Sequence, residues 1–132
     1  MDESITQDNY DYIFITEDCM GNKVALKPGT FGYKILPKHP EVTPDLIREG
    51  VESAHIVAKD PHPDRNRFRY YRYVLTPIQG RDDITNLKVV TEINSSNEYG
   101  EIITAYLLRD LKGEITKGDI IYDSGSASKR GI

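Results

Sequence analysis

Hydrophobic and polar residues alternate along the second half of this chain, a pattern typical of half-buried β-strands. Residues 67–75 alternate most strictly, and successive side chains of a strand point to opposite faces. One face carries Phe68, Tyr70, Arg72 and Val74, and the other carries Arg67, Arg69, Tyr71 and Tyr73. Further strands are predicted at residues 12–16, 54–59, 87–93, 101–108 and 119–123, separated by polar turns.

A helix is predicted over residues 43–53, where the apolar spacing changes from two residues to three and four. Thr43 suits the N-cap, and Pro44 suits the first helical position, where no backbone N–H is needed. The apolar side chains of one helical face are Leu46, Ile47 and Val51. Gly50 costs about 1 kcal/mol relative to alanine, or it allows another element to approach closely. A second, shorter helix at residues 30–36 is weakly marked.

The order of these elements predicts an α+β domain. Successive strands joined by short polar loops favour an antiparallel meander, and the helix before them would cover one face. We therefore expect one or more N-terminal helices packed on an antiparallel sheet of about four or five strands. A single domain is expected over residues 1–123, and the small, polar segment 124–132 is expected to be a flexible tail.

Composition limits the class of protein. The chain has 132 residues, of which 38% are hydrophobic and 29% charged, enough for one domain with a core. No apolar run approaches the ~20 residues of a membrane-spanning helix, and the acidic start does not resemble a secretory signal. Cys19 is the single cysteine, which excludes an internal disulfide and a thiol-rich zinc site. We expect a cytoplasmic protein with no membrane partner, no cofactor and no metal.

Charge is distributed unevenly along the chain. The net charge is −4, but residues 59–81 carry six Lys or Arg against two Asp, so this segment is +4 and the remainder is −8. A basic strip on an acidic protein can still bind phosphates, because the local potential governs contact with an anion. The alternative is that these arginines only keep an exposed strand soluble. The sequence leaves both interpretations open.

Several short motifs occur in a characteristic order. They are Lys38-His39-Pro40-Glu41 before the helix, then Ile56-Val57, Tyr70-Tyr71-Arg72, Leu87-Lys88-Val89-Val90 and Ile102-Ile103-Thr104-Ala105-Tyr106. This set resembles the phage- and toxin-associated nuclease group that shares the barnase–EndoU–colicin–RelE-like fold, and it covers roughly residues 34–110. Ala54-His55 stand where that group commonly has Pro-Asp, and residues 1–30 have no counterpart, so they form an unmatched N-terminal decoration.

The resemblance implies a metal-independent endoribonuclease of toxin or phage type. In such enzymes the 2′-hydroxyl attacks the adjacent phosphate and leaves a 2′,3′-cyclic phosphate. The substrate would be RNA, either tRNA or mRNA, and a cognate inhibitor protein would protect the host. The reaction needs an acid, a base and cations for the charge on phosphorus, and histidine and arginine suit these roles.

The same resemblance implies a set of site residues. His39 would be the acid or base, Lys38 and Arg72 would stabilise charge, and Thr104 and Tyr106 would line the site. Contacts with RNA would come from Arg67, Arg69, Tyr71, Tyr73 and Lys88, with the tyrosines stacking on unpaired bases. Alternatives remain: His39 could only fix the entry to the helix, and Arg72 could pair with a carboxylate such as Glu92.

A second function is open on the same fold. The unmatched residues 1–30 and the departure at Ala54-His55 leave room for a phage-derived protein that has lost the chemistry. Such a protein would bind and inhibit a host protein or a bacterial defence complex. A third possibility is an antitoxin-like neutraliser.

Overall fold

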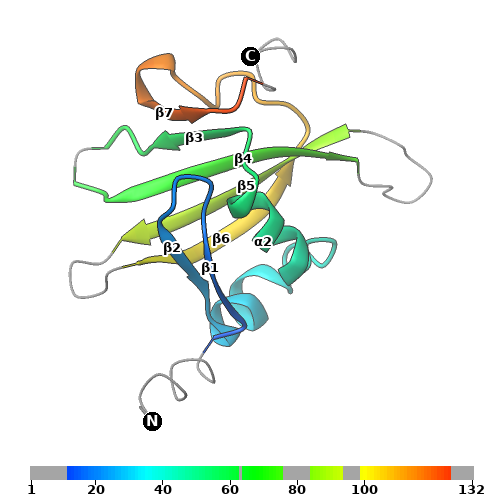
Figure 1. The fold of residues 1–132 in the computed structure, drawn as a ribbon. Helices are drawn as coiled ribbons and strands as arrows, with labels where there is room; N and C mark the ends of the chain where they lie inside the picture. Colours follow the sequence, from blue (N-terminus) through cyan, green and yellow to red (C-terminus); the bar gives the residue numbers. More distant parts are fainter. Residues whose placement is uncertain (1–11, 63, 76–83, 94–98, 126–132) are drawn as a thin grey trace.

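The computed structural model describes residues 12–62, 64–75, 84–93 and 99–125 (Figure 1). Residues 1–11, which belong to the expected N-terminal decoration, and most of the expected flexible tail (126–132) lie outside these residues. The strands are β1 (Phe14–Glu17), β2 (Lys23–Leu26), β3 (Ile56–Lys59), β4 (Arg67–Leu75), β5 (Ile84–Ile93), β6 (Gly100–Leu108) and β7 (Ile120–Asp123). The helical elements are α2 (Pro44–Glu52), the π-helix η1 (Thr30–Ile35) and the 3-10 turn η2 (Lys117–Asp119).

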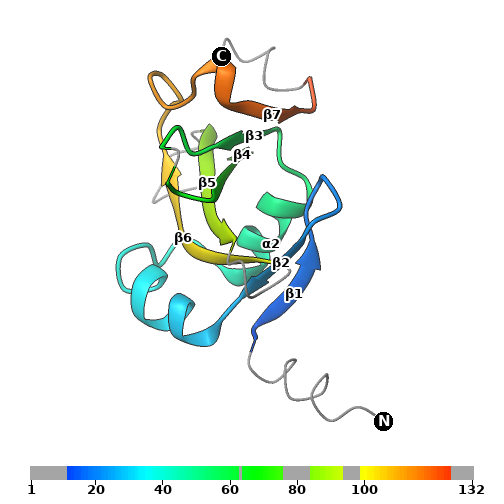
Figure 2. The same ribbon diagram turned by 90° about the vertical axis from the view of Figure 1, so that its left-hand side faces the viewer.

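The strands form one mixed sheet of seven strands, in the order β1-β2-β6-β5-β4-β3-β7, which curls around α2 (Figures 1 and 2). The prediction of N-terminal helices on an antiparallel sheet of four or five strands is therefore wrong. Strands β3 to β6 do form the expected antiparallel meander. However, β2 pairs in parallel with β6, and β7 returns to pair with β3. Within the described residues, α2 is the single α-helix.

Helix α2 forms where the local signals predict it. The Thr43 Oγ1 accepts a hydrogen bond from the Leu46 N–H at 3.1 Å, and Pro44 occupies the first turn. Gly50 is buried, and a Cβ at this position would lie 2.6 Å from the Leu87 Cδ2. Glycine therefore lets the helix lie close against β5, which is the second of the two roles considered for it.

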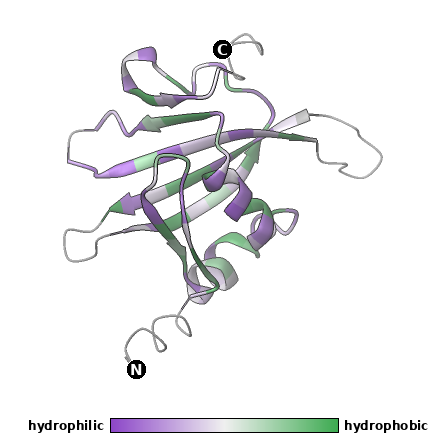
Figure 3. Cartoon of the chain, viewed as in Figure 1, coloured by the Kyte–Doolittle hydropathy of each residue, from purple (hydrophilic) through white to green (hydrophobic). Residues whose placement is uncertain are grey.

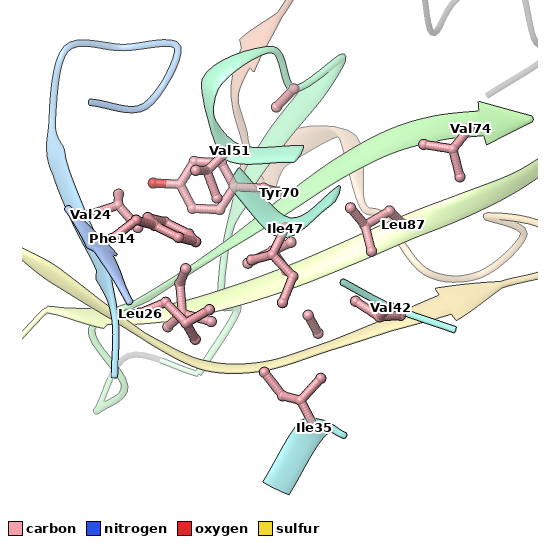
Figure 4. Packing of buried hydrophobic residues seen from close by; sticks show 14 of the residues in the cluster. Phe14, Val24, Leu26, Ile35, Val42, Ile47, Val51, Tyr70, Val74 and Leu87 are labelled. Carbon is pink, nitrogen blue, oxygen red and sulfur yellow. The ribbon is translucent and has the colours of Figure 1, made fainter. Parts of the chain in front are cut away.

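The core lies between α2 and the sheet (Figure 4). Its fully buried side chains come from α2 (Ile47, Val51), from β2 (Val24, Leu26) and from the central strands (Tyr70, Leu87, Val89). Strand colouring by hydropathy shows hydrophilic and hydrophobic bands alternating along the strands (Figure 3). We call the α2-covered side of the sheet the helix face; on β4 it carries Phe68, Tyr70, Arg72 and Val74.

The opposite side of the sheet is crossed by residues 109–119, which connect β6 to β7 (Figure 2). We call it the loop face; on β4 it carries Arg67, Arg69, Tyr71 and Tyr73. A smaller apolar cluster fastens the crossing segment there, with Leu111 and Ile115 packed against Ile56, Ala58 and Tyr71. The sheet therefore has two faces with different coverings, and the candidate site residues are divided between them.

Candidate functional site

His39 lies in the turn between η1 and α2. Its N–H donates to the Ile35 carbonyl at 2.7 Å, and its carbonyl accepts from the Val42 N–H at 3.0 Å. Ile35 and Val42 are fully buried, so both ends of the turn are anchored in the core. The His39 side chain itself remains 30% exposed, with Nδ1 4.0 Å from the Glu41 Oε2. A fixed backbone and an accessible imidazole are what a proton-transfer residue needs.

The His39 ring stacks on Tyr106, with 5.5 Å between ring centroids and 27° between planes. This contact exists because β2 pairs with β6 only at Gly100 and Glu101. Beyond Glu101, η1 packs beside β6 in place of a strand (Figure 2). The turn that follows η1 brings the His39 ring against Tyr106 on the loop face. The structure thus brings together two of the predicted site residues that are far apart in sequence.

Tyr106 is one end of a row of side chains across three strands. Tyr71, Lys88 and Tyr106 are direct cross-strand partners on β4, β5 and β6. The Lys88 Nζ lies 5.9 Å from the centroid of the Tyr71 ring and 5.5 Å from that of Tyr106, within cation–π range of both. The row places an ammonium group beside the tyrosine on which His39 stacks.

Thr104 lies on the loop face beside this row. It is two residues before Tyr106 on β6. Its cross-strand partner is Val90 of β5, and Val90 pairs on its other side with Arg69 of β4. The register of β5 against β6 shifts directly after this pair, between Val90 and Thr91. Thr104 is partly exposed, and its site-lining role stays a prediction.

The crossing segment brings a carboxylate to the row. The Oε1 of Glu114 is in close contact with the Lys88 Nζ and accepts a hydrogen bond from the Tyr71 hydroxyl at 3.2 Å. Partial burial opposes ionisation of Glu114, but the hydrogen bond and charge of Lys88 outweigh it, so the pKa of this carboxyl is lowered. Sequence reasoning missed Glu114, because its segment has the composition of a polar turn and gives no signal of which face of the sheet it covers.

Arg69 holds the same segment in place. Its Nη1 donates to the Glu114 carbonyl at 3.0 Å, its Nη2 donates to the Lys59 carbonyl at 2.7 Å, and Asp119 lies 3.9 Å away. The Arg69 side chain is only 12% exposed. In this structure the Arg69 guanidinium thus binds backbone carbonyls, and its contact with RNA stays a prediction.

Arg72 lies on the helix face, away from His39. Its Nε donates to the Glu49 Oε1 at 3.0 Å, and its Nη1 donates to the Ser53 carbonyl at 2.7 Å. The alternative to a catalytic role was that Arg72 pairs with a carboxylate such as Glu92. Arg72 does pair with a carboxylate, but that carboxylate belongs to Glu49 of α2. Arg72 therefore fastens the end of the helix, and the structure does not bring it to the imidazole.

The remaining predicted contacts are dispersed. Tyr71 is 1% exposed, so its ring is not available for stacking on a base, and burial raises the pKa of its hydroxyl. Tyr73 stacks on His55 at 4.2 Å, and Arg67 donates to Glu92 at 2.9 Å. Lys38 is exposed next to His39. The part of the basic strip that the structure describes is thus divided between two faces by strand alternation.

Comparison of the chain with protein-family models, curated proteins and solved structures found no match. Within the described residues, no group of three or more His, Cys, Asp or Glu side chains is placed to hold a metal ion. No helix in the same part of the chain is both long and apolar enough to cross a membrane.

Proposed function

We propose that this protein is a metal-independent endoribonuclease that uses the loop face of its sheet beside the β6 edge. The observation that carries the proposal is the arrangement of His39, Tyr106 and Lys88: an accessible imidazole stacked on a tyrosine whose ring also contacts an ammonium group. Acid–base chemistry on a phosphodiester needs a titratable group near neutral pH beside a cation. The resemblance to the phage- and toxin-associated nucleases, which implies the roles of these residues, points to the same reaction.

The proposed reaction is internal transfer at phosphorus. The 2′-oxygen bonds to phosphorus as the bond from phosphorus to the 5′-oxygen breaks. His39 removes the 2′-hydroxyl proton or delivers one to the 5′-oxygen, and a second group (Tyr106, Thr104 or a lysine) completes the pair. Lys88 and Lys38 stabilise the phosphorane charge in this scheme, whereas Arg72 lies on the other face. The products are a 2′,3′-cyclic phosphate and a 5′-hydroxyl.

The substrate in this proposal is tRNA or mRNA, and a cognate inhibitor protein protects the host. The test compares the parent, His39→Ala and His62→Ala in chelator-treated buffer with mixed cellular RNA. His62 is the matched control, because it is an exposed histidine in another loop. We expect His39→Ala to lower the cleavage rate at least ~100-fold, as loss of an acid or base does, and to relieve growth inhibition. Equal rates for all three proteins would refute the role of His39.

A second function is favoured by the ion pairs of the sheet. Four cations on β4 and β5 are matched with carboxylates: Arg67 with Glu92, Arg69 with Asp119, Arg72 with Glu49 and Lys88 with Glu114. A surface neutralised in this way suits a protein partner better than a polyanion. The alternative is therefore a non-enzymatic, phage-derived inhibitor of a host or defence complex. Co-purification of a stable protein partner, with no RNA turnover by the parent, would favour this function.

A further inference from the structure

Glu114 occupies the position where an RNA phosphate would meet Lys88. Its carboxylate is in close contact with the Lys88 Nζ, and the Tyr71 hydroxyl donates to the same oxygen at 3.2 Å. The Lys88 side chain is only 13% exposed, so its ammonium group has little surface left for a second anion. Any phosphate placed beside His39 and Tyr106 would compete with this carboxylate for Lys88.

The segment that carries Glu114 is fastened at points outside the Lys88 contact. Leu111 and Ile115 pack in the apolar cluster of the loop face, and Arg69 binds the Glu114 carbonyl at 3.0 Å. These contacts do not depend on the Glu114 carboxylate. The carboxylate can therefore leave Lys88 by rotation of its own side chain, while the segment remains on the sheet.

We propose that Glu114 is an autoinhibitory carboxylate, a built-in competitor that the substrate phosphate must displace from Lys88 before the site is complete. This inference rests on the proposed nuclease function. Glu114 stays ionised at neutral pH, because contact with Lys88 lowers its pKa in spite of partial burial. The affinity for RNA is then lower than it would be if Lys88 had no carboxylate partner. Cleavage is therefore slow when the RNA concentration is low.

The test measures binding of a fluorescent single-stranded oligodeoxynucleotide, which offers phosphates but has no 2′-hydroxyl and cannot be cleaved by the proposed reaction. Glu114→Gln keeps the shape of the side chain and removes its charge. We expect this variant to bind the probe about tenfold more tightly than the parent, the size of one charge-assisted hydrogen bond released to the ligand. Glu49→Gln is the matched control, because it also removes one ion-paired carboxylate, but on the helix face. Its affinity is expected to stay within about twofold of the parent.

The outcomes separate this inference from the proposed function. If Lys88→Ala weakens binding while Glu114→Gln and Glu49→Gln leave it unchanged, Glu114 does not compete and the inference is overturned, but the nuclease site stands. If the parent, Lys88→Ala and Glu114→Gln all fail to bind the probe and to cleave RNA, both fail. If Glu114→Gln does not fold, Glu114→Asp withdraws the carboxylate by one methylene, and a gain of about threefold is expected. Unchanged affinity in that folded variant would also overturn the inference.

Discussion

The Tyr70 hydroxyl joins the β1–β2 turn to the centre of the sheet, and its removal should destabilise the fold. Tyr70 is 1% exposed and donates to the Asp18 Oδ2 at 2.6 Å (Figure 4 shows the hydroxyl among the core side chains). Asp18 is 6% exposed, and its other oxygen accepts the backbone N–H groups of Met20 and Asn22 at 2.8 and 2.7 Å. A buried carboxylate is therefore satisfied by three donors, one of them from a distant strand.

The size of the effect follows from what Tyr70→Phe removes. The phenyl ring would keep its packing, but one oxygen of a buried carboxylate would lose its donor. A hydrogen bond to a charged group contributes about 1.5–3 kcal/mol, so we expect a loss of about 2 kcal/mol in the free energy of unfolding. For a domain of this size this corresponds to a fall in Tm of about 6–8 °C. Burial raises the pKa of the Tyr70 hydroxyl, and its hydrogen bond to Asp18 raises it further. The hydroxyl therefore remains a donor across the usual pH range.

The assay is chemical and thermal unfolding, with circular dichroism as the signal. Tyr33→Phe is the matched control, because the Tyr33 side chain is 85% exposed and loses the same hydroxyl in solvent. The control is expected to lie within about 0.5 kcal/mol of the parent. If Tyr70→Phe unfolds with the same midpoint as this control, the Asp18 contact does not stabilise the fold and the reasoning fails.

Three further predictions concern the rest of the molecule. Burial raises the pKa of the Cys19 thiol to about 11 from 9.0, so at pH 8 its alkylation should be about 100-fold slower than that of an unperturbed thiol; equal rates would contradict this. Arg72→Ala should lower the free energy of unfolding by about 1 kcal/mol, because Glu49 and the end of α2 lose a donor. The rate of RNA cleavage should stay within about twofold of the parent, and a loss as large as that of His39→Ala would show that Arg72 acts in the reaction. Gly50→Ala should destabilise the protein by about 1 kcal/mol, since overpacking against Leu87 outweighs the gain in helix propensity, and a stabilised variant in urea unfolding would contradict this.

The sequence predicts the elements of this fold better than their partners. The N-cap at Thr43 and the spacing of Ile47 and Val51 are local signals, and they place α2 within a residue of its observed ends. Strand alternation likewise depends on neighbouring residues. The parallel pairing of β2 with β6 and the return of β7 to β3 depend on contacts between distant segments, which a period-two pattern does not encode.

The candidate site shows the same division. Alternation along residues 67–75 separates Arg72 from Arg69 and Tyr71, but it does not say which face meets Tyr106. Only the register of β4, β5 and β6 settles that Lys88, and not Arg72, lies beside Tyr106. The contact of His39 with Tyr106 needs η1 to replace a strand along β6. The weakly marked helix predicted at residues 30–36 lies where η1 forms, but its sequence gives no signal that it packs beside β6. The catalytic roles themselves stay predictions.

The chemical identity of the ends of cleaved RNA tests the nuclease proposal most directly. An RNA oligonucleotide is incubated with the parent and with His39→Ala in excess chelator, and the products are analysed by mass spectrometry. The proposal predicts 2′,3′-cyclic phosphate and 5′-hydroxyl ends from the parent, no cleavage at a 2′-deoxy position, and loss of these products in the variant. Ends carrying a 5′-phosphate, or the same products at the same rate from His39→Ala, would contradict it.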